Sequence, residues 1–377
     1  MRSVSSPTIV DARINALLQR CAREVNEGLL PSCQVAIGFE GELIAREAFG
    51  TADHDTTYCL FSATKAFVAA AFWQLISEGV VDPTSPVATH LDVFDDDDKR
   101  AITVEQVMLH SSGFPHAPLG PPAWDSSPTR REAMSRWRLN WEPGTRYEYH
   151  PTSAHWVLAE IMIEVTGNDY RDEVAARVTS PLGLPRILGI TPTTQTAAEL
   201  VLTGEVAGPD ELEAAFGVRE LPANEVTDDV LLRFNSPEVM ELGVPGGGGW
   251  GRATDLALFY QGLLHNPGEL WEPNLLADVT GRVRNRMPDP MGVPANRSLG
   301  LVLAGSDGHS HLRGMGRTLS AEAFGHNGAG GQIAWADPAT GLSVGYTTNG
   351  LDRHQIRQPR RTTSIASLAG LCTTPLD

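Results

Sequence analysis

The segment from Ser62 to Gly79 is apolar on nearly every face of the helix that its residue pattern predicts. A helix without a polar face belongs in the interior of a protein or of a membrane. The chain contains no run of about 18 apolar residues, so this segment is not a membrane span. It is expected to be a buried helix, yet Lys65 lies in its second turn. Burying a lysine costs free energy, so a lysine kept at this position is expected to have a task.

Lysine is rare in this chain. Of the 29 basic residues, only Lys65 and Lys99 are lysines, and the others are arginines. Arginine keeps its proton in proteins, whereas a buried lysine can lose it and act as a base. Lys99 follows four aspartates at positions 95–98, and this pattern predicts a solvated, charged loop. Lys65 is therefore the candidate base.

A serine precedes this lysine by three positions, in the order Ser62-Ala63-Thr64-Lys65. Residues three apart share one face of a helix, so the hydroxyl and the amine are expected to be neighbours. Burial beside Phe61 and Phe67 should lower the pKa of Lys65, and a neutral amine can take the serine proton. Four residues of this kind also arise by chance, as a helix-start serine and a surface lysine. The apolar helix that follows favours the catalytic interpretation.

Strand patterns occur at both ends of the chain and helical patterns between them. The segments Cys33–Phe39 with Leu43–Phe49, and Gly331–Ala336 with Leu342–Thr348, each predict a hairpin. This order predicts an α+β fold, in which an antiparallel sheet flanked by helices is built from residues 1–85 and 245–377. Residues 86–244 are expected to form a mainly helical second domain. Helices are predicted over Ala12–Glu27, Ser62–Gly79, Val104–Leu109, Arg131–Arg138, Ala154–Val165, Tyr170–Val178, Ala253–Leu264 and Arg353–Leu371.

Five short motifs follow one another in a particular order along the chain. They are Ser62-Ala63-Thr64-Lys65, Leu109-His110-Ser111-Ser112-Gly113-Phe114-Pro115, Pro143-Gly144-Thr145-Arg146-Tyr147-Glu148-Tyr149, Gly247-Gly248-Gly249 with Asp255-Leu256, and Phe324-Gly325-His326-Asn327-Gly328. In this order they resemble the class C β-lactamase-related serine hydrolases, a branch of the penicillin-binding-protein superfamily that includes carboxylesterases and D-amino-acid peptidases. The resemblance implies a β-lactamase/transpeptidase-like fold and a catalytic centre of Ser62, Lys65 and Tyr149.

The chain departs from the second family motif, Y-x-N, because it has Tyr149-His150-Pro151. The resemblance makes Tyr149 the proton relay, and a phenol near an ammonium should ionise more readily. An aromatic core residue is the alternative interpretation of Tyr149. His150 either supplies a polar substrate contact in place of the asparagine or lies at the surface.

The third motif, K-T-G or H-x-G, corresponds to His326-Asn327-Gly328. Gly328 would let substrate approach the strand closely. The resemblance implies that the N–H groups of Ala329 and Ser62 form the oxyanion hole. Since histidine is mostly neutral near pH 7, His326 favours neutral esters or amides over substrates with a carboxylate.

Composition excludes several other classes. A net charge of −17 disfavours nucleic acids and anionic membrane surfaces. No export signal is recognisable, and the cysteines show no paired spacing, so a cytoplasmic protein is expected, with Cys33 and Cys59 as small buried residues. The pairs His309/His311 and His110/His116 lack the H-E-x-x-H spacing, and no metal or cofactor is expected.

The sequence therefore predicts a serine hydrolase that forms an acyl-enzyme on Ser62, with small-molecule esters or amides as substrates. A carboxylesterase acting on small or medium acyl groups is favoured. A D-amino-acid peptidase or amidase, an acyltransferase or a β-lactamase would use the same centre. A non-catalytic relative that binds ligand in the same cleft is the alternative of another class. The oligomeric state does not follow from the sequence.

Overall fold

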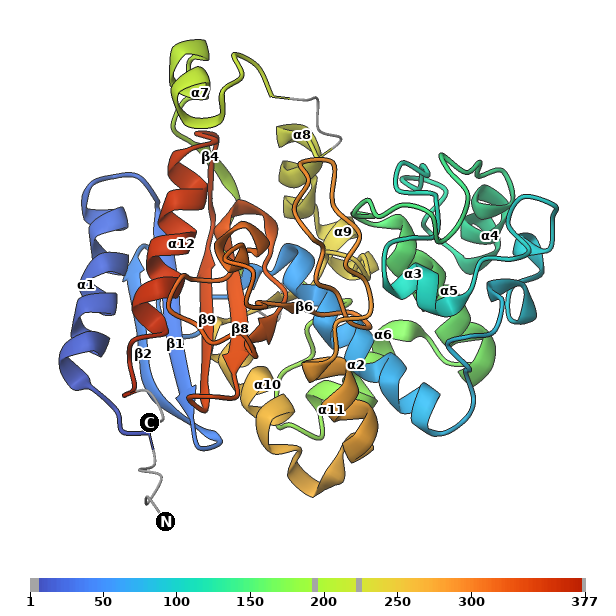
Figure 1. The fold of residues 1–377 in the computed structure, drawn as a ribbon, viewed down its shortest axis with the longest axis horizontal. Coiled ribbons are helices and arrows are strands. Elements are labelled where there is room, and N and C mark those ends of the chain that lie inside the picture. Colours follow the sequence, from blue (N-terminus) through green and yellow to red (C-terminus); the bar gives the residue numbers. More distant parts are fainter. Residues whose placement is uncertain (1–6, 192–195, 222–225, 375–377) are drawn as a thin grey trace.

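The computed structural model describes residues 7–191, 196–221 and 226–374. The positions outside these ranges include both ends of the predicted sheet domain and two short pieces of the predicted helical domain. A six-stranded antiparallel sheet in the order β2-β1-β9-β8-β7-β6 has its long strands in the left half of the view in Figure 1. Its strands are β1 Ser32–Phe39, β2 Glu42–Gly50, β6 Val302–Leu303, β7 Phe324–Gly325, β8 Ile333–Asp337 and β9 Leu342–Thr348. The pairing of β1 with β9 joins the two ends of the chain in one sheet, which confirms the predicted fold class.

Both faces of the sheet are covered by helices. Side chains alternate along a strand, so Val35 and Ile37 of β1 face a core shared with α1 (Asp11–Asn26) and α12 (Arg357–Ala369). Ala36 faces the opposite side, where α10 (Ala253–His265) packs. A Cβ on Gly345 of β9 would lie 2.0 Å from the carbonyl oxygen of Ala253, so only glycine lets α10 pack this closely.

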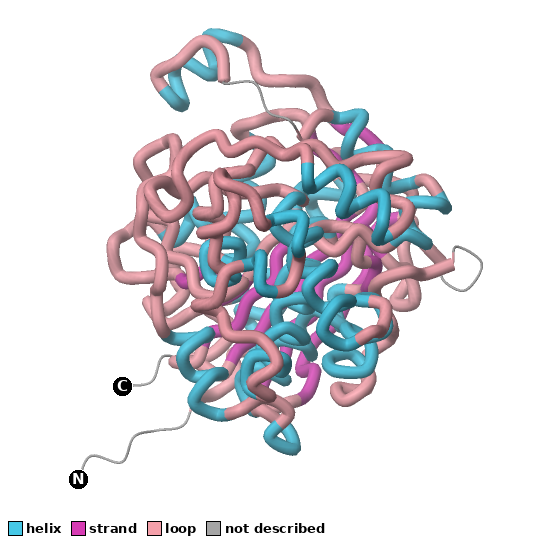
Figure 2. The backbone as a smooth tube through the Cα atoms, turned by 90° about the vertical axis from the view of Figure 1, so that its right-hand side faces the viewer, coloured by secondary structure: helices cyan, strands magenta, loops and turns pink. Residues whose placement is uncertain are grey.

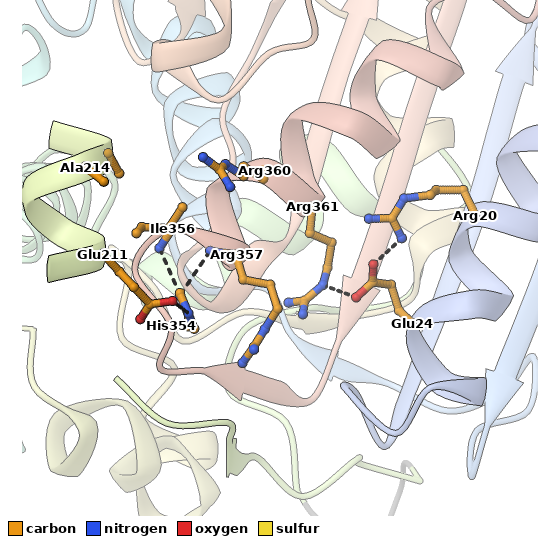
Figure 3. Close-up of a pocket in the computed structure, with 10 residues that line it drawn as sticks. Arg20, Glu24, Glu211, Ala214, His354, Ile356, Arg357, Arg360 and Arg361 are labelled. Carbon is orange, nitrogen blue, oxygen red and sulfur yellow. Dashed lines mark hydrogen bonds and ion pairs between the residues drawn. The ribbon is translucent and has the colours of Figure 1, made fainter. Parts of the chain in front are cut away.

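An ion-pair network fixes α12 against α1. Arg361 bonds Glu24 of α1, and its Nη2 lies 2.6 Å from Asp352. Arg20 bonds the same glutamate, and Arg357 bonds the same aspartate. Figure 3 shows the arginines of this cluster and Glu24, which line a cavity of about 470 Å³. Because these guanidinium groups already have carboxylate partners, we interpret the cluster as structural.

The buried helix predicted from Ser62 is α2, Thr64–Ser77, preceded by a short turn at Phe61–Ala63. Trp73 of α2 donates from Nε1 to the carbonyl of Leu299 (2.7 Å). Most other helices come from the middle of the chain, and α7 projects at the top of the molecule (Figures 1 and 2). They are α3 Val104–Met108, α4 Ser127–Ser135, α5 Ser153–Thr166, α6 Tyr170–Val174, α7 Pro209–Phe216, α8 Asp228–Leu232, α9 Pro237–Leu242 and α11 Pro273–Gly281. Two small pairings complete the fold, β3 Tyr58–Cys59 with β5 Trp250–Gly251 and β4 Val201–Thr203 with β10 Gly350–Asp352.

Two local predictions were wrong. The helix predicted at Arg131–Arg138 begins earlier, because Ser126 caps it and Pro128 suits its first turn. Lys99 is fully buried, and its Nζ donates to the carbonyls of Met134 (3.0 Å) and Ser135 (3.1 Å). The carboxylate of Asp96 accepts the backbone N–H of Lys99, which turns the chain back and directs the lysine inward.

Candidate active site

Ser62 lies in the turn that leads into α2. Phe61, directly before it, has φ of 45°, a left-handed conformation that is strained for a bulky side chain. Packing holds this strain in place, because Phe61 is buried and its ring meets Phe234 edge-on at 5.5 Å. The neighbours of Ser62 are buried, whereas Ser62 itself is partly exposed. The hydroxyl can therefore be reached from solution.

The amine of Lys65 lies against this hydroxyl. Its Nζ is 3.2 Å from Oγ of Ser62 and 2.7 Å from the carbonyl oxygen of Pro151, and it also bonds the carbonyl of Gly246. Burial and the nearby guanidinium of Arg297 hold the pKa of Lys65 well below its usual value. A neutral amine has two N–H groups, which the two carbonyls accept. Its lone pair then remains for the proton of Ser62.

Tyr149 contacts the same hydroxyl, with its Oη 2.9 Å from Oγ of Ser62. Burial raises the pKa of Tyr149, although Arg297 and the bond to Ser62 act in the opposite direction. The expectation that this phenol ionises readily was therefore wrong, because the loss of hydration outweighs the nearby cation. Burial therefore favours the uncharged form of both groups, the amine of Lys65 and the phenol of Tyr149.

His110 holds the chain on both sides of Tyr149. Its carbonyl accepts from the N–H of Glu148 (3.3 Å), and its Nδ1 accepts from the N–H of His150 (3.1 Å). The centres of the His110 and Tyr149 rings lie 4.8 Å apart. His110 has φ of 56°, so this clamp requires a conformation that few side chains adopt. Burial lowers the pKa of His110, which leaves Nδ1 free to accept.

The third motif follows β7. A Cβ on Gly328 would lie 2.3 Å from the carbonyl oxygen of Leu60, so glycine lets this segment approach the chain just before Ser62. Ala329 begins a turn, Ala329–Gly331, which contacts the turn carrying Ser62. The two N–H groups expected to form the oxyanion hole therefore lie on neighbouring turns.

His326 is buried beside these turns, and both of its nitrogens are engaged. Nε2 lies 3.2 Å from Nη1 of Arg297, and Nδ1 lies 3.0 Å from the carbonyl oxygen of Asn327. Arginine can only donate, so Nε2 accepts and Nδ1 carries the proton. The structure thus fixes one neutral form of this ring.

His150 is fully buried, neither at the surface nor free for substrate. Its Nε2 bonds Ser112 Oγ (3.1 Å) and the N–H of Phe114 (3.3 Å), and its Nδ1 bonds the carbonyl of Glu148 (2.6 Å). These contacts engage both ring nitrogens, so His150 has a packing role and does not make the expected substrate contact. His150 therefore does not supply the polar substrate contact that the asparagine of the family motif would make beside Tyr149.

Arg297 was not predicted from the sequence. It is 7% exposed, and its Cζ lies 5.0 Å from the centre of the Tyr149 ring. Its Nε donates to Oη of Tyr147 (2.9 Å). The only available signal was indirect: a histidine at position 326 where the family motif has a lysine leaves the site without an obvious cation.

Among residues 7–191, 196–221 and 226–374, no three His, Cys, Asp or Glu side chains are grouped to hold a metal ion. All four cysteines are free and buried, as predicted for Cys33 and Cys59. No helix between residues 7 and 374, in the described part, is long and apolar enough to cross a membrane.

The chain is similar to several known proteins. The family model described as Beta-lactamase matches residues 15–367. The Esterase/beta-lactamase LipL of Mycobacterium tuberculosis is 28% identical over 325 residues, which cover 79% of this chain and 70% of LipL. Esterase EstB of Burkholderia gladioli is 26% identical and covers 90% of both chains. The crystal structure of a family VIII carboxylesterase superposes with a TM-score of 0.75 at 22% identity, covering 96% of this chain and 99% of that one.

Proposed function

We propose that this chain, which belongs to the beta-lactamase family, is a serine hydrolase that cleaves carboxylic esters through an acyl-enzyme on Ser62. The contact of Ser62 Oγ with both Lys65 Nζ (3.2 Å) and Tyr149 Oη (2.9 Å) carries the proposal. It brings a nucleophile, a base and an acid together at one partly exposed oxygen. Two relatives that match most of the chain support ester substrates, because EstB is named an esterase and LipL an esterase/beta-lactamase.

Acylation begins when the neutral amine of Lys65 takes the proton of Ser62. The oxygen of Ser62 bonds to the ester carbonyl carbon, and the carbonyl oxygen becomes negative. The N–H groups of Ser62 and Ala329 stabilise that charge. The carbon–oxygen bond to the alcohol then breaks, and Tyr149 donates its proton to the departing oxygen. Transfer of the proton from Lys65 to the tyrosinate restores both groups.

Deacylation repeats these steps with water as the nucleophile. The amine of Lys65 takes one proton from water, and the hydroxide oxygen bonds to the acyl carbon. The bond between that carbon and the oxygen of Ser62 then breaks. The proton returns to the oxygen of Ser62, and the carboxylic acid leaves. The enzyme ends in the state in which it began.

The test uses an active-site probe together with an ester of short or medium chain length, such as p-nitrophenyl butyrate. A fluorophosphonate should label the wild type at Ser62 and block turnover. Ser62→Ala should abolish both labelling and turnover, whereas Ser77→Ala, at the exposed end of α2, should leave both intact. A wild type that neither labels nor turns over would indicate a non-catalytic relative. Turnover of nitrocefin or D-alanyl amides in preference to esters would replace the ester assignment.

A further inference from the structure

The cavity of about 470 Å³ beside the ion-pair network of α1 and α12 lies apart from the catalytic centre. Figure 3 shows the side chains that line it, with Arg360 and Arg361 on α12, Glu24 on α1 and Ala214 on α7. None of the catalytic side chains is among them. A volume of this size is typical of sites that bind small molecules. The cavity is therefore large enough for a ligand of its own.

The ion-pair network that lines this cavity is one carboxylate short. Arg20 and Arg361 share the carboxylate of Glu24, and Arg357 and Arg361 share that of Asp352. Three cations thus meet two anions. Arg361 is only 2% exposed, and its Nη1 is buried without a hydrogen-bond partner among the described residues. A buried donor without an acceptor is costly, so Arg361 is expected to meet a further acceptor.

Two more charged groups line the cavity, from facing helices. Arg360 of α12 is exposed and points toward α7 in Figure 3, and in the described ranges no carboxylate lies within ion-pair distance of it. Glu211 of α7 has its Oε1 3.8 Å from Nε2 of His354 and pairs with no arginine in that part of the chain. The charges of Arg360 and Glu211 cancel in the count. One positive charge remains in excess, in a chain whose net charge is −17.

Part of the cavity wall is apolar. Ala214 and Ala215 of α7 line it together with Ile356, just before α12. Ile356 packs against Ala207 and Leu212, so this part of the wall continues into a small apolar cluster. A ligand that lies between α7 and α12 would contact guanidinium groups at one end and hydrocarbon at the other.

We propose that this cavity is a second ligand site, which binds a monocarboxylate with a hydrocarbon chain. A single carboxylate balances the one excess positive charge, and a guanidinium can donate two parallel N–H groups to its oxygens. Arg360 and Nη1 of Arg361 supply free N–H groups, while Ala214 and Ile356 contact the chain. Inorganic phosphate carries more charge and no hydrocarbon, so it matches neither part of the wall. The acids released by the proposed esterase belong to this ligand class, but binding here does not depend on turnover.

The test is isothermal titration calorimetry with hexanoate at pH 7.5 and low salt, on enzyme whose Ser62 has been blocked with a fluorophosphonate. One hexanoate should bind, and hexanamide and inorganic phosphate should bind about tenfold or more weakly. Arg360→Met, at an exposed position, should weaken hexanoate binding by about the same factor, and Arg360→Lys should keep part of it. Arg136→Met removes the same charge at an exposed position of α4 and should bind hexanoate like the wild type.

A second variant leaves every arginine in place. Ala214→Glu supplies the missing carboxylate from α7, so it should also weaken hexanoate binding. Equal affinities for hexanoate and hexanamide, or an unchanged affinity in Arg360→Met, would overturn the proposal. Phosphate binding as tight as that of hexanoate would overturn the assignment of the ligand class.

The result is independent of the proposed function. A protein that is inactive on p-nitrophenyl butyrate and does not label at Ser62 can be titrated untreated, and hexanoate binding that is lost in Arg360→Met would still support the site. An active esterase that binds no hexanoate after Ser62 is blocked would overturn the site and leave the esterase assignment intact.

Discussion

The amine of Lys65 lies 3.2 Å from the hydroxyl oxygen of Ser62, and Lys65 is fully buried in α2. Two backbone carbonyls occupy its N–H groups, so the lone pair has one acidic proton within reach, that of Ser62. The spacing of three residues sets this contact, and the burial of α2 sets the protonation state that makes it useful.

Replacing the amine with a permanent cation should stop the reaction. Lys65→Arg places a permanent positive charge at this position and cannot accept a proton, so kcat for p-nitrophenyl butyrate should fall about 10²- to 10⁴-fold. Steady-state kinetics measure this effect, and circular dichroism checks that the variant is folded. A Lys65→Arg enzyme with near-normal kcat would show that the amine is not the base.

Tyr149 should matter most when the alcohol is a poor leaving group. Tyr149→Phe removes the proton donor at 2.9 Å from Ser62, which a strongly basic alkoxide needs and p-nitrophenolate does not. Ethyl butyrate turnover, followed in a pH-stat, should fall at least tenfold further than p-nitrophenyl butyrate turnover. Equal losses with both esters would mean that Tyr149 acts on the nucleophile and not on the leaving group.

His110 should act on the rate without touching the substrate. His110→Ala removes the acceptor for the N–H of His150, so Tyr149 loses one of its two anchors. We expect kcat to fall about tenfold or more with KM little changed, because a misplaced catalytic group costs rate. His309→Ala, in an exposed loop, serves as the control. A change in KM alone would contradict the positioning role.

Local spacing and periodicity predicted much of the fold. The hairpins at both ends and the buried helix after Ser62 follow from side-chain patterns within a few residues of one another. The two-residue strands β6 and β7 are too short for any pattern to show. Helices α7, α8, α9 and α11 were not predicted because each is short and begins in a polar segment.

The site residues likewise divide into those that local sequence predicts and those that only the fold brings together. Ser62 and Lys65 share one helical turn, so spacing alone brings them together. Tyr149 is 87 positions from Ser62, and only the order of family motifs indicated it. Arg297 lies in a loop with no motif, and only the folded chain brings it beside the ring of Tyr149.

The buried histidines make a further prediction about stability in acid. Burial lowers the pKa of His110, His155 and His326 well below 6.5, and that of His150 to about 3. The folded chain therefore holds these rings neutral, while the unfolded chain protonates them near pH 6.5. Their contribution to stability is complete above that pH and decreases as the pH falls below it, by about 1.4 kcal/mol per pH unit for each ring that stays neutral in the folded chain.

His155 allows this effect to be isolated. Neither of its ring nitrogens has a hydrogen-bond partner of ordinary geometry among the described residues, so His155→Met should remove a titrating group with little loss of hydrogen bonding. Between pH 7 and pH 5, urea unfolding should show a smaller loss of stability in this variant than in the wild type. The difference corresponds to about one fewer proton bound on unfolding. His54→Met, at an exposed position, should follow the wild type. Identical pH slopes in His155→Met and wild type would mean that His155 is already protonated in the folded protein.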